Sequence, residues 1–400
     1  MKIGQYLLVM GFIAFIFSIG FKSIAAEDRD ISELENRPLA QKPEVTINGL
    51  ITGELPKEYE EYFTDQFTNR DTWVEMFTKS ELLLNKTFIN NFHITDENFI
   101  LARPSTGFPQ KKLDASAEEL NELGNILNQK GTSLYFFPMP AKINETNRLL
   151  PWYVPRGSGK KNTEYLLSNL NNEVIGTNVS SIMNEKYSSK EMTDFYFKTD
   201  HHWNIKGAFA GLQVMMDVIA EKYPIPKDYS LDNYDFSCVK QSALIGSWNK
   251  ELQMLVDPAA DPVCHYFPND YSFNDYQVYM GKAEDGVRKE PSEIYASGLK
   301  KKLTTFNFHD AYADNYAELN IINPNSSNKL NVLLIKDSYA NPIIFPIAHH
   351  FHQTTIFDPR YDKKRSVMDM VNENQYDAVI ILYNTNNLTG SMYEFEKTAE

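Results

Sequence analysis

The stretch "KLNVLLIKDSYANPIIFPIAHHFHQTTIF", residues 329–357, decides the fold. Its first apolar run ends at Lys336 and predicts a buried strand, "NPIIFPIAHHF" predicts a helix, and "QTTIF" predicts a second strand. The alternation continues with a predicted helix in "RSVMDMVNEN" and a predicted strand in "YDAVIILYN". Apolar strands that alternate with helices indicate an α/β fold, in which crossover helices flank a parallel sheet.

The same alternation begins near residue 100. "SAEELNELGNILNQKG" predicts a helix that ends at Gly131, and "TSLYFFPMP" predicts a buried strand that the prolines stop. Residues 224–330 are rich in Tyr, Asn, Asp and Pro and show no clear pattern. We therefore expect one α/β domain over residues 100–400.

The N-terminus indicates export. An apolar run from Tyr6 to Phe21 predicts a membrane anchor or a signal peptide over residues 1–26, and "SIAA" at 23–26 is a possible cleavage site. Either interpretation places the rest of the chain outside the cytoplasm, secreted or at the cell surface. We expect residues 27–99 to form an extended and helical segment that packs on the main domain, with a helix over residues 55–87.

Composition narrows the class of protein. The 400 residues carry a net charge of −14, which argues against a general nucleic-acid binder, because such proteins need clustered Lys and Arg. Cys238 and Cys264 are too few for a disulfide framework. They either pair in an oxidising compartment or stay as two free thiols, and the sequence leaves both open.

A second stretch, "FYFKTDHHWNIKGAFAG" at residues 195–211, carries an acid and two imidazoles. "DFYFK" predicts a short strand, and a helix is predicted from Ile205 with Asn204 as its N-cap. If residues 200–202 are extended, Asp200 and His202 point to one side and His201 to the other. An Asp beside a His on one face suits orientation of the imidazole and stabilisation of its protonated form.

Such a pair needs a nucleophile, and Ser338 is the best candidate. It follows the strand that ends at Lys336, and Pro342 fits the first turn of the next helix. A serine between strand and helix lies at the carboxyl edge of the sheet, where neighbouring N–H groups can stabilise an oxyanion. The alternative is that Ser338 is only an N-cap.

These residues resemble the DHHW family of bacterial exported proteins. "TDHHWN", "SELENRPLAQKPE" (32–44), "GELPKEYEEYFTDQFTNRDTWV" (53–74), "KDSY" and "FDPRY" look like that family's pattern, and "TDHHWN" is similar to the D-x-H-W motif of the alginate O-acetylation proteins. The resemblance implies an SGNH-hydrolase-like domain with a Ser338-His202-Asp200 triad.

The implied activity is O-acetyl transfer to a cell-surface polysaccharide, or acetyl-ester hydrolysis, through an acetyl-serine intermediate. It also implies a membrane-bound acyltransferase that supplies acetyl groups. We expect no cofactor and no metal. The chain departs from ordinary SGNH hydrolases in its Asp, His, Ser order, and it has "KDS" where they have GDS. Separate Gly and Asn oxyanion motifs are not recognisable, so the oxyanion hole stays unassigned.

Two rival interpretations remain open. Asp-His-His also resembles the motif of DHH phosphoesterases, but a partner set of metal ligands is not found, and "AHHFH" (349, 350 and 352 are His) fits a helix end better than a metal site. The second rival interpretation is a non-catalytic surface protein that binds a polysaccharide through its aromatic residues. For substrate binding the further candidates are Arg360, Tyr361, Trp203 and Asn384.

Overall fold

The computed structural model describes residues 3–32 and 37–399 of the chain. Residues 33–36 of the "SELENRPLAQKPE" segment lie outside the described residues. The chain divides into two compact units, residues 1–90 with 249–255, and residues 91–248 with 256–400. The domain boundary expected between residues 99 and 100 stays a prediction.

The first unit begins with the apolar helix α1 (Ile3–Ala25). Its 23 residues have a mean hydropathy of 2.1 over the most apolar window and are long enough to cross a membrane, a test that a signal sequence also passes. The short strands and helices that follow are β1 (Ile31–Ser32), β2 (Arg37–Pro38), α2 (Ile47–Thr52), α3 (Glu54–Asp65) and α4 (Arg70–Leu83).

The single helix expected over residues 55–87 is wrong, because the segment forms two helices. The break lies between α3 and α4, where Asn69 adopts a left-handed conformation with φ of 54°. Asn tolerates this conformation better than most residues, and a residue in it cannot continue a right-handed helix.

The second unit is built on a mixed sheet of eight strands within the described residues, in the order β11-β10-β13-β15-β14-β16-β5-β6. Strands β5, β16, β14 and β15 are mutually parallel, as the sequence predicted, and β6 joins them in parallel, whereas β13, β10 and β11 continue the sheet through antiparallel pairings, each with the strand beside it. The bounds are β5 (Ser133–Met139), β6 (Val174–Gly176), β10 (Gln277–Met280), β11 (Val287–Lys289), β13 (Glu318–Ile322), β14 (Asn331–Lys336), β15 (Gln353–Phe357) and β16 (Ala378–Asn384).

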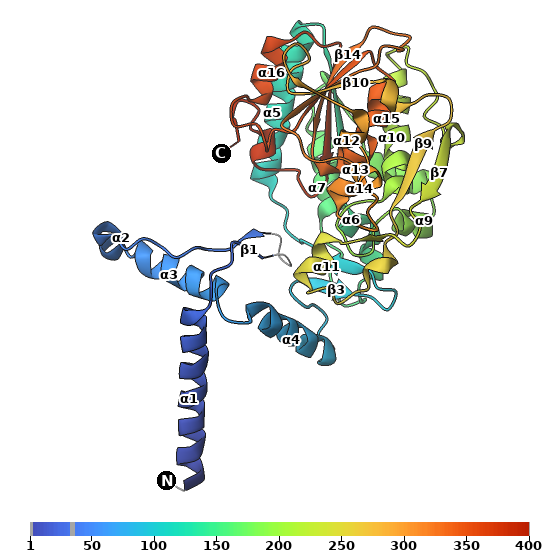
Figure 1. The fold of residues 1–400 in the computed structure, drawn as a ribbon. Coiled ribbons are helices and arrows are strands. Elements are labelled where there is room, and N and C mark those ends of the chain that lie inside the picture. Colours follow the sequence, from blue (N-terminus) through green and yellow to red (C-terminus); the bar gives the residue numbers. More distant parts are fainter. Residues whose placement is uncertain (1–2, 33–36, 400) are drawn as a thin grey trace. The chain divides into compact units, whose positions relative to one another are not determined.

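Helices cover both faces of this sheet (Figure 1). One layer holds α5 (Gln110–Gln129) and α16 (Val367–Glu373), which share a core with Leu333 and Ile335 of β14. The other holds α8 (Val179–Lys186), α10 (Ile205–Ala220) and α15 (Ile344–His349), which share a core with Leu334. The alternation of side chains along β14 therefore buries it on both faces, which explains its continuous apolar run.

The segment 224–330 supplies the antiparallel edge of the sheet and several short elements. Among these, β7 (Tyr234–Cys238) pairs with β9 (Cys264–Pro268), and Cys238 and Cys264 form a disulfide between them. The remaining elements are β3 (Phe92–Ile94), β4 (Ile100–Ala102), α6 (Lys142–Thr146), α7 (Gly159–Ser168), α9 (Ser189–Asp194), β8 (Ala243–Leu244), α11 (Ser247–Glu251), α12 (Pro291–Ile294), α13 (Ser297–Lys300), β12 (Thr305–Phe306), α14 (Phe308–Ala311) and the 3-10 helices η1 (Asn147–Leu149), η2 (Leu231–Asn233), η3 (Pro258–Ala260), η4 (Phe273–Asp275), η5 (Ser338–Ile343) and η6 (Ser391–Tyr393).

The strand expected in "DFYFK" is also wrong. Helix α9, which a capping box at Ser188 starts, runs into this segment and ends at Asp194. The chain then forms a tight loop, in which Tyr196 bridges to Trp203 and the Asn204 N–H donates to the Phe195 carbonyl. The helix that follows does begin at Ile205, and the Asn204 side chain caps it as expected.

Candidate active site

Ser338 lies at the carboxyl end of the central strand β14, as the first residue of η5. The N-cap of η5 is Asp337, whose Oδ1 accepts a hydrogen bond from the Tyr339 N–H at 2.9 Å. Ser338 is therefore not the cap, and its hydroxyl is available for another partner. Pro342 lies inside η5 and not, as expected, in the first turn of the α-helix, which begins only at Ile344.

Asp337 also fixes this segment to the neighbouring strand. Its Oδ2 accepts hydrogen bonds from the Asn384 N–H at 2.7 Å and from Asn387 Nδ2 at 3.1 Å. The buried Asp337 carboxyl has a raised pKa, because burial disfavours its charged form more than these donors favour it. Since the Tyr339 N–H donates to Asp337, it does not point to an oxyanion position beside Ser338.

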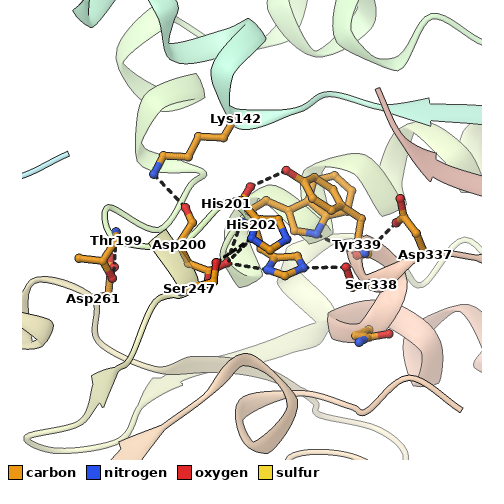
Figure 2. Close-up of polar contacts among 12 residues, drawn as sticks. Lys142, Thr199, Asp200, His201, His202, Ser247, Asp261, Asp337, Ser338 and Tyr339 are labelled. Atoms are coloured by element: carbon orange, nitrogen blue, oxygen red, sulfur yellow. Dashed lines mark hydrogen bonds and ion pairs between the residues drawn. The ribbon is translucent and has the colours of Figure 1, made fainter. Parts of the chain in front are cut away.

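The loop "KTDHH", residues 198–202, brings an acid and an imidazole to Ser338 (Figure 2). His202 Nε2 lies 2.8 Å from Ser338 Oγ, and His202 Nδ1 lies 2.6 Å from Asp200 Oδ1. Although 136 positions separate His202 from Ser338 in the sequence, the fold places the three side chains in one hydrogen-bonded line. This geometry is the one that acid–base activation of a serine hydroxyl requires.

Asp200 is buried and ionised. Burial alone would raise the pKa of its carboxyl, but the imidazoles of His201 and His202 and the hydrogen bonds from His202 and Ser247 hold that pKa well below its usual range. The Ser247 N–H donates to Asp200 Oδ2 at 2.7 Å, and the His202 N–H donates to Oδ1 at 3.0 Å. The carboxylate is thus oriented by fixed donors.

The His202 ring is held between two other rings. Phe308 stacks on it with a centroid distance of 3.7 Å and an interplanar angle of 6°, and His201 lies against it at 3.8 Å. The expected alternation, with His201 on the opposite side, is wrong because the chain turns at these residues and is not extended. His201 Nδ1 instead lies 2.9 Å from Ser247 Oγ.

His201 stays neutral in this arrangement. Although 36% of its side chain is exposed, the burial of the remainder and the neighbouring His202 lower its pKa to about 4. A neutral His201 ring adds no positive charge to the site.

A buried lysine supports the 198–202 loop from behind, and the sequence assigned it no role. Lys142 Nζ donates to the carbonyl oxygen of Asp200 at 2.9 Å (Figure 2). It also donates to the carbonyl oxygen of Lys198 at 2.9 Å and lies 4.6 Å from the centre of the Trp248 ring. Burial lowers the pKa of Lys142 to about 7, against the opposing pull of Asp261 and Asp200. Its only sequence signal is its place directly after the buried strand β5.

Asp261 and Gly246 also contact the 198–202 loop and hold it in place. The Asp261 carboxylate accepts hydrogen bonds from the N–H groups of Lys198 and Thr199, at 2.6 and 2.7 Å. Gly246 passes close to the loop, and a Cβ there would lie 2.2 Å from the Thr199 carbonyl oxygen. Glycine at this position therefore lets the next residue, Ser247, reach Asp200.

Among the further substrate-binding candidates, the prediction for Trp203 is wrong. It is completely buried, and its Nε1 donates to the Tyr339 carbonyl at 2.9 Å, so its ring has no free face for a substrate. Asn384 is also buried, and its Oδ1 accepts a hydrogen bond from Asn386. Arg360 forms a two-pronged ion pair with Asp358 and lines a separate pocket, whose other lining residues include Ser391, Glu394 and Lys397.

Tyr361 is half exposed, beneath the Arg360 guanidinium. Among the described residues, no hydrogen bond or ion pair joins Arg360 or Tyr361 to His202 or Ser338, so their role in substrate binding stays a prediction.

Asp200, His201 and His202 also form a group whose ligand atoms lie within 4.8 Å of one another. Each of those residues already has hydrogen-bond partners within the site, including Ser247 and Ser338, and a metal ion would have to displace them. In "AHHFH", α15 ends at His349, which lies 2.8 Å from Asp228 and packs on Tyr271. The prediction of a helix end there is confirmed.

A sheet with helices on both faces and an Asp-His-Ser line at its carboxyl edge define an SGNH-like α/β protein. Comparisons with known proteins agree. Residues 101–263 match the family described as "SGNH hydrolase-like domain, acetyltransferase AlgX", a region that contains Asp200 and His202 but not Ser338. A search of curated proteins finds no match.

Two solved structures are similar over most of the chain. PatB1 of Bacillus cereus is 30% identical, with a TM-score of 0.69, and the match covers 76% of this chain and 99% of PatB1. A DHHW family protein from Eubacterium siraeum is 18% identical, with a TM-score of 0.56, over 78% of this chain and 97% of that protein, which shows a shared fold. The chain belongs to this SGNH hydrolase-like acetyltransferase family, as its resemblance to the DHHW and alginate O-acetylation proteins indicated.

Proposed function

We propose that this protein is a serine O-acetyltransferase that acts on a saccharide outside the cytoplasm. The observation that carries the proposal is the short line of contacts from Asp200 through His202 to Ser338. Family membership supports acetyl transfer as the chemistry, and the apolar helix α1 supports a membrane anchor or signal. A membrane-bound acyltransferase as the source of acetyl groups is part of the same proposal.

The reaction proceeds in two halves. Ser338 Oγ attacks the acetyl carbonyl carbon of the donor ester while His202 Nε2 takes the hydroxyl proton. The tetrahedral intermediate then expels the donor alcohol, which receives that proton from His202, and leaves an acetyl ester on Ser338. Asp200 keeps Nδ1 protonated and stabilises the positive ring.

In the second half a hydroxyl group of the acceptor sugar attacks the acetyl-serine. His202 accepts the proton of that hydroxyl, and Ser338 leaves with the proton returned to its Oγ. If water takes the place of the sugar, the same steps give an acetylesterase. The packing of Phe308 against His202 favours a fixed imidazole that serves both halves.

Acetyl release and acetyl transfer can be measured separately. The purified chain is incubated with 4-nitrophenyl acetate, with and without a soluble polysaccharide, and both nitrophenol and sugar-bound acetate are measured. We expect both products with the natural chain and neither above background with Ser338→Ala. Undiminished release of nitrophenol by Ser338→Ala would refute the serine mechanism. A non-catalytic polysaccharide-binding protein would give no release from either chain.

A further inference from the structure

A polar pocket lies at the same edge of the sheet as Ser338. Its volume is about 330 Å³, which is within the range of small-ligand sites. It is lined by Asn144 and Glu145 of α6, Lys160 of α7, Asn184 of α8, and Thr385, which directly follows β16. Because β14, β16 and β5 are neighbouring parallel strands, the segments after their carboxyl ends lie side by side, and Ser338 belongs to the first of them.

The floor of the pocket is organised around one buried carboxylate. Glu145 accepts hydrogen bonds from Lys160 Nζ at 2.9 Å, Ser180 Oγ at 2.6 Å and Asn184 Nδ2 at 2.9 Å. Asn144 Nδ2 donates to Thr385 Oγ1 at 3.1 Å. These contacts fix amide and hydroxyl groups in a concave surface, which is the chemistry that recognises sugar hydroxyl and acetamido groups.

An exposed aromatic pair lies on the loop between two of the pocket helices. Trp152 and Tyr153 are 88% and 57% exposed, and their rings meet edge to face at 5.7 Å. The loop, residues 150–158, joins the α6–η1 segment to α7 and is fixed by Arg156 Nη1, which donates to the carbonyls of Asn147 and Leu150. Trp and Tyr are enriched at interaction surfaces, because their large rings also carry a polar group.

The charge of the pocket limits what it can bind. Glu145, Glu164 and Glu185 line it together with a single cation, Lys160, which already pairs with Glu145. A ligand that carries a carboxylate would meet unbalanced negative charge, whereas an uncharged sugar would not.

We propose that this pocket, with Trp152 as a stacking surface, binds an uncharged sugar unit of the polysaccharide and is a subsite for the acetyl acceptor. The role as acceptor subsite rests on the function proposed above, but the binding itself does not. We do not expect polymers of uronic acids to be preferred ligands, because their carboxylates would meet the negative charge of the pocket.

Saccharide binding tests the inference without any catalysis. Calorimetric titration of the full chain with a tetramer of N-acetylglucosamine is compared with titration by a tetramer of galacturonic acid, in the absence of an acetyl donor. We expect the neutral tetramer to bind more tightly, and we expect Trp152→Ala and Asn184→Ala each to weaken that binding about tenfold. Phe236→Ala, which removes an exposed aromatic ring of β7 outside the pocket, is the matched control and is expected to bind as the natural chain does.

The inference is overturned if the neutral tetramer does not bind, if the acidic tetramer binds as tightly, or if Trp152→Ala and Phe236→Ala have equal effects. Thermal unfolding of each variant shows whether a loss of binding reflects loss of the fold. A natural chain that binds the tetramer but releases no nitrophenol from 4-nitrophenyl acetate refutes the proposed function alone. One that releases nitrophenol but binds no tetramer refutes this inference alone.

Discussion

At the scale of single residues, the candidate site depends on how firmly His202 is held. Asp200 fixes one ring nitrogen, Ser338 lies at the other, and Phe308 and His201 cover the two faces of the ring. The imidazole therefore has little freedom to rotate, and the energy needed to order it is expended during folding and not during the reaction.

Substitutions within this set should have unequal effects. We expect Asp200→Ala and His202→Ala to lower kcat/KM for 4-nitrophenyl acetate by about a thousandfold or more, because His202 carries the proton and Asp200 orients and stabilises the ring that carries it. His201→Ala should cost much less, because its ring packs beside His202 and has no contact with Ser338. Steady-state kinetics measures this, and an equal loss at His201 and His202 would contradict the assignment.

Lys142 gives a prediction about pH. Its pKa in the folded protein is about 7, below the value near 10.4 of an unfolded lysine, so the unfolded chain binds more protons between these two values. The free energy of unfolding of the natural chain should therefore rise relative to that of Lys142→Met as pH increases from 7 to 10, by up to about 1.4 kcal/mol per pH unit.

Chemical denaturation of both proteins at several pH values measures the difference. Lys206→Met, at an exposed lysine of α10, serves as the control and should show no such trend. A stability difference between natural chain and Lys142→Met that stays constant across this range would show that Lys142 titrates normally.

Some residues of the candidate site could be predicted from the sequence and others could not. Asp200, His202 and Ser338 could be proposed because their residue types and places near element ends suit one chemistry. The position of His201 could not be predicted, because the chain turns at residues 198–202 through contacts with distant residues, Lys142 and Asp261 among them. The place of Lys142 after a buried strand did not reveal its role, since its burial depends on Trp248 and on the loop carbonyls.

At the scale of elements, the buried strands were the most predictable part. Strands β5, β14 and β16 read as apolar runs because both of their faces are covered by helices. The antiparallel strands β10 and β11 are short and only partly buried, so their sequences carry no comparable pattern. The strand prediction for "DFYFK" failed because the aromatic residues of this segment are buried in a loop and not in a strand.

The disulfide between β7 and β9 is a covalent cross-link within the less regular segment of residues 224–330. The two cysteines are 26 positions apart, and a loop of that length predicts a contribution to stability of about 3.5 kcal/mol. We expect the double variant Cys238→Ser, Cys264→Ser to lower the free energy of unfolding by about that amount, measured by denaturant titration. The natural chain after reduction should match it, and an unchanged stability would mean that the bond does not form in the isolated protein.

At the scale of the whole molecule, one unit of the chain carries the site and the other carries the apolar helix α1. Asp200, His202, Ser338 and the polar pocket all belong to the unit of residues 91–248 and 256–400. This division suits a protein in which one end is held at a membrane or removed after export, while the other works on a polymer outside the cell. Residence outside the cytoplasm and contact with an acyltransferase remain parts of the proposal.

Covalent labelling of Ser338 tests the central claim most directly. A solved structure of PatB1 carries a sulfonyl adduct, and the same chemistry can be applied to this chain. With methanesulfonyl fluoride, Ser338 Oγ would form a bond to sulfur and expel fluoride, while His202 takes the hydroxyl proton. The label is located by peptide mass spectrometry, and the remaining esterase activity is measured in the same samples.

The account predicts that the label resides on Ser338, that activity falls in proportion to labelling, and that His202→Ala is labelled far more slowly. Prior incubation with an acetyl ester should protect Ser338. A chain that is fully labelled at Ser338 and still active, or one that loses activity with the label on another residue, would contradict the claim that Ser338 is the nucleophile.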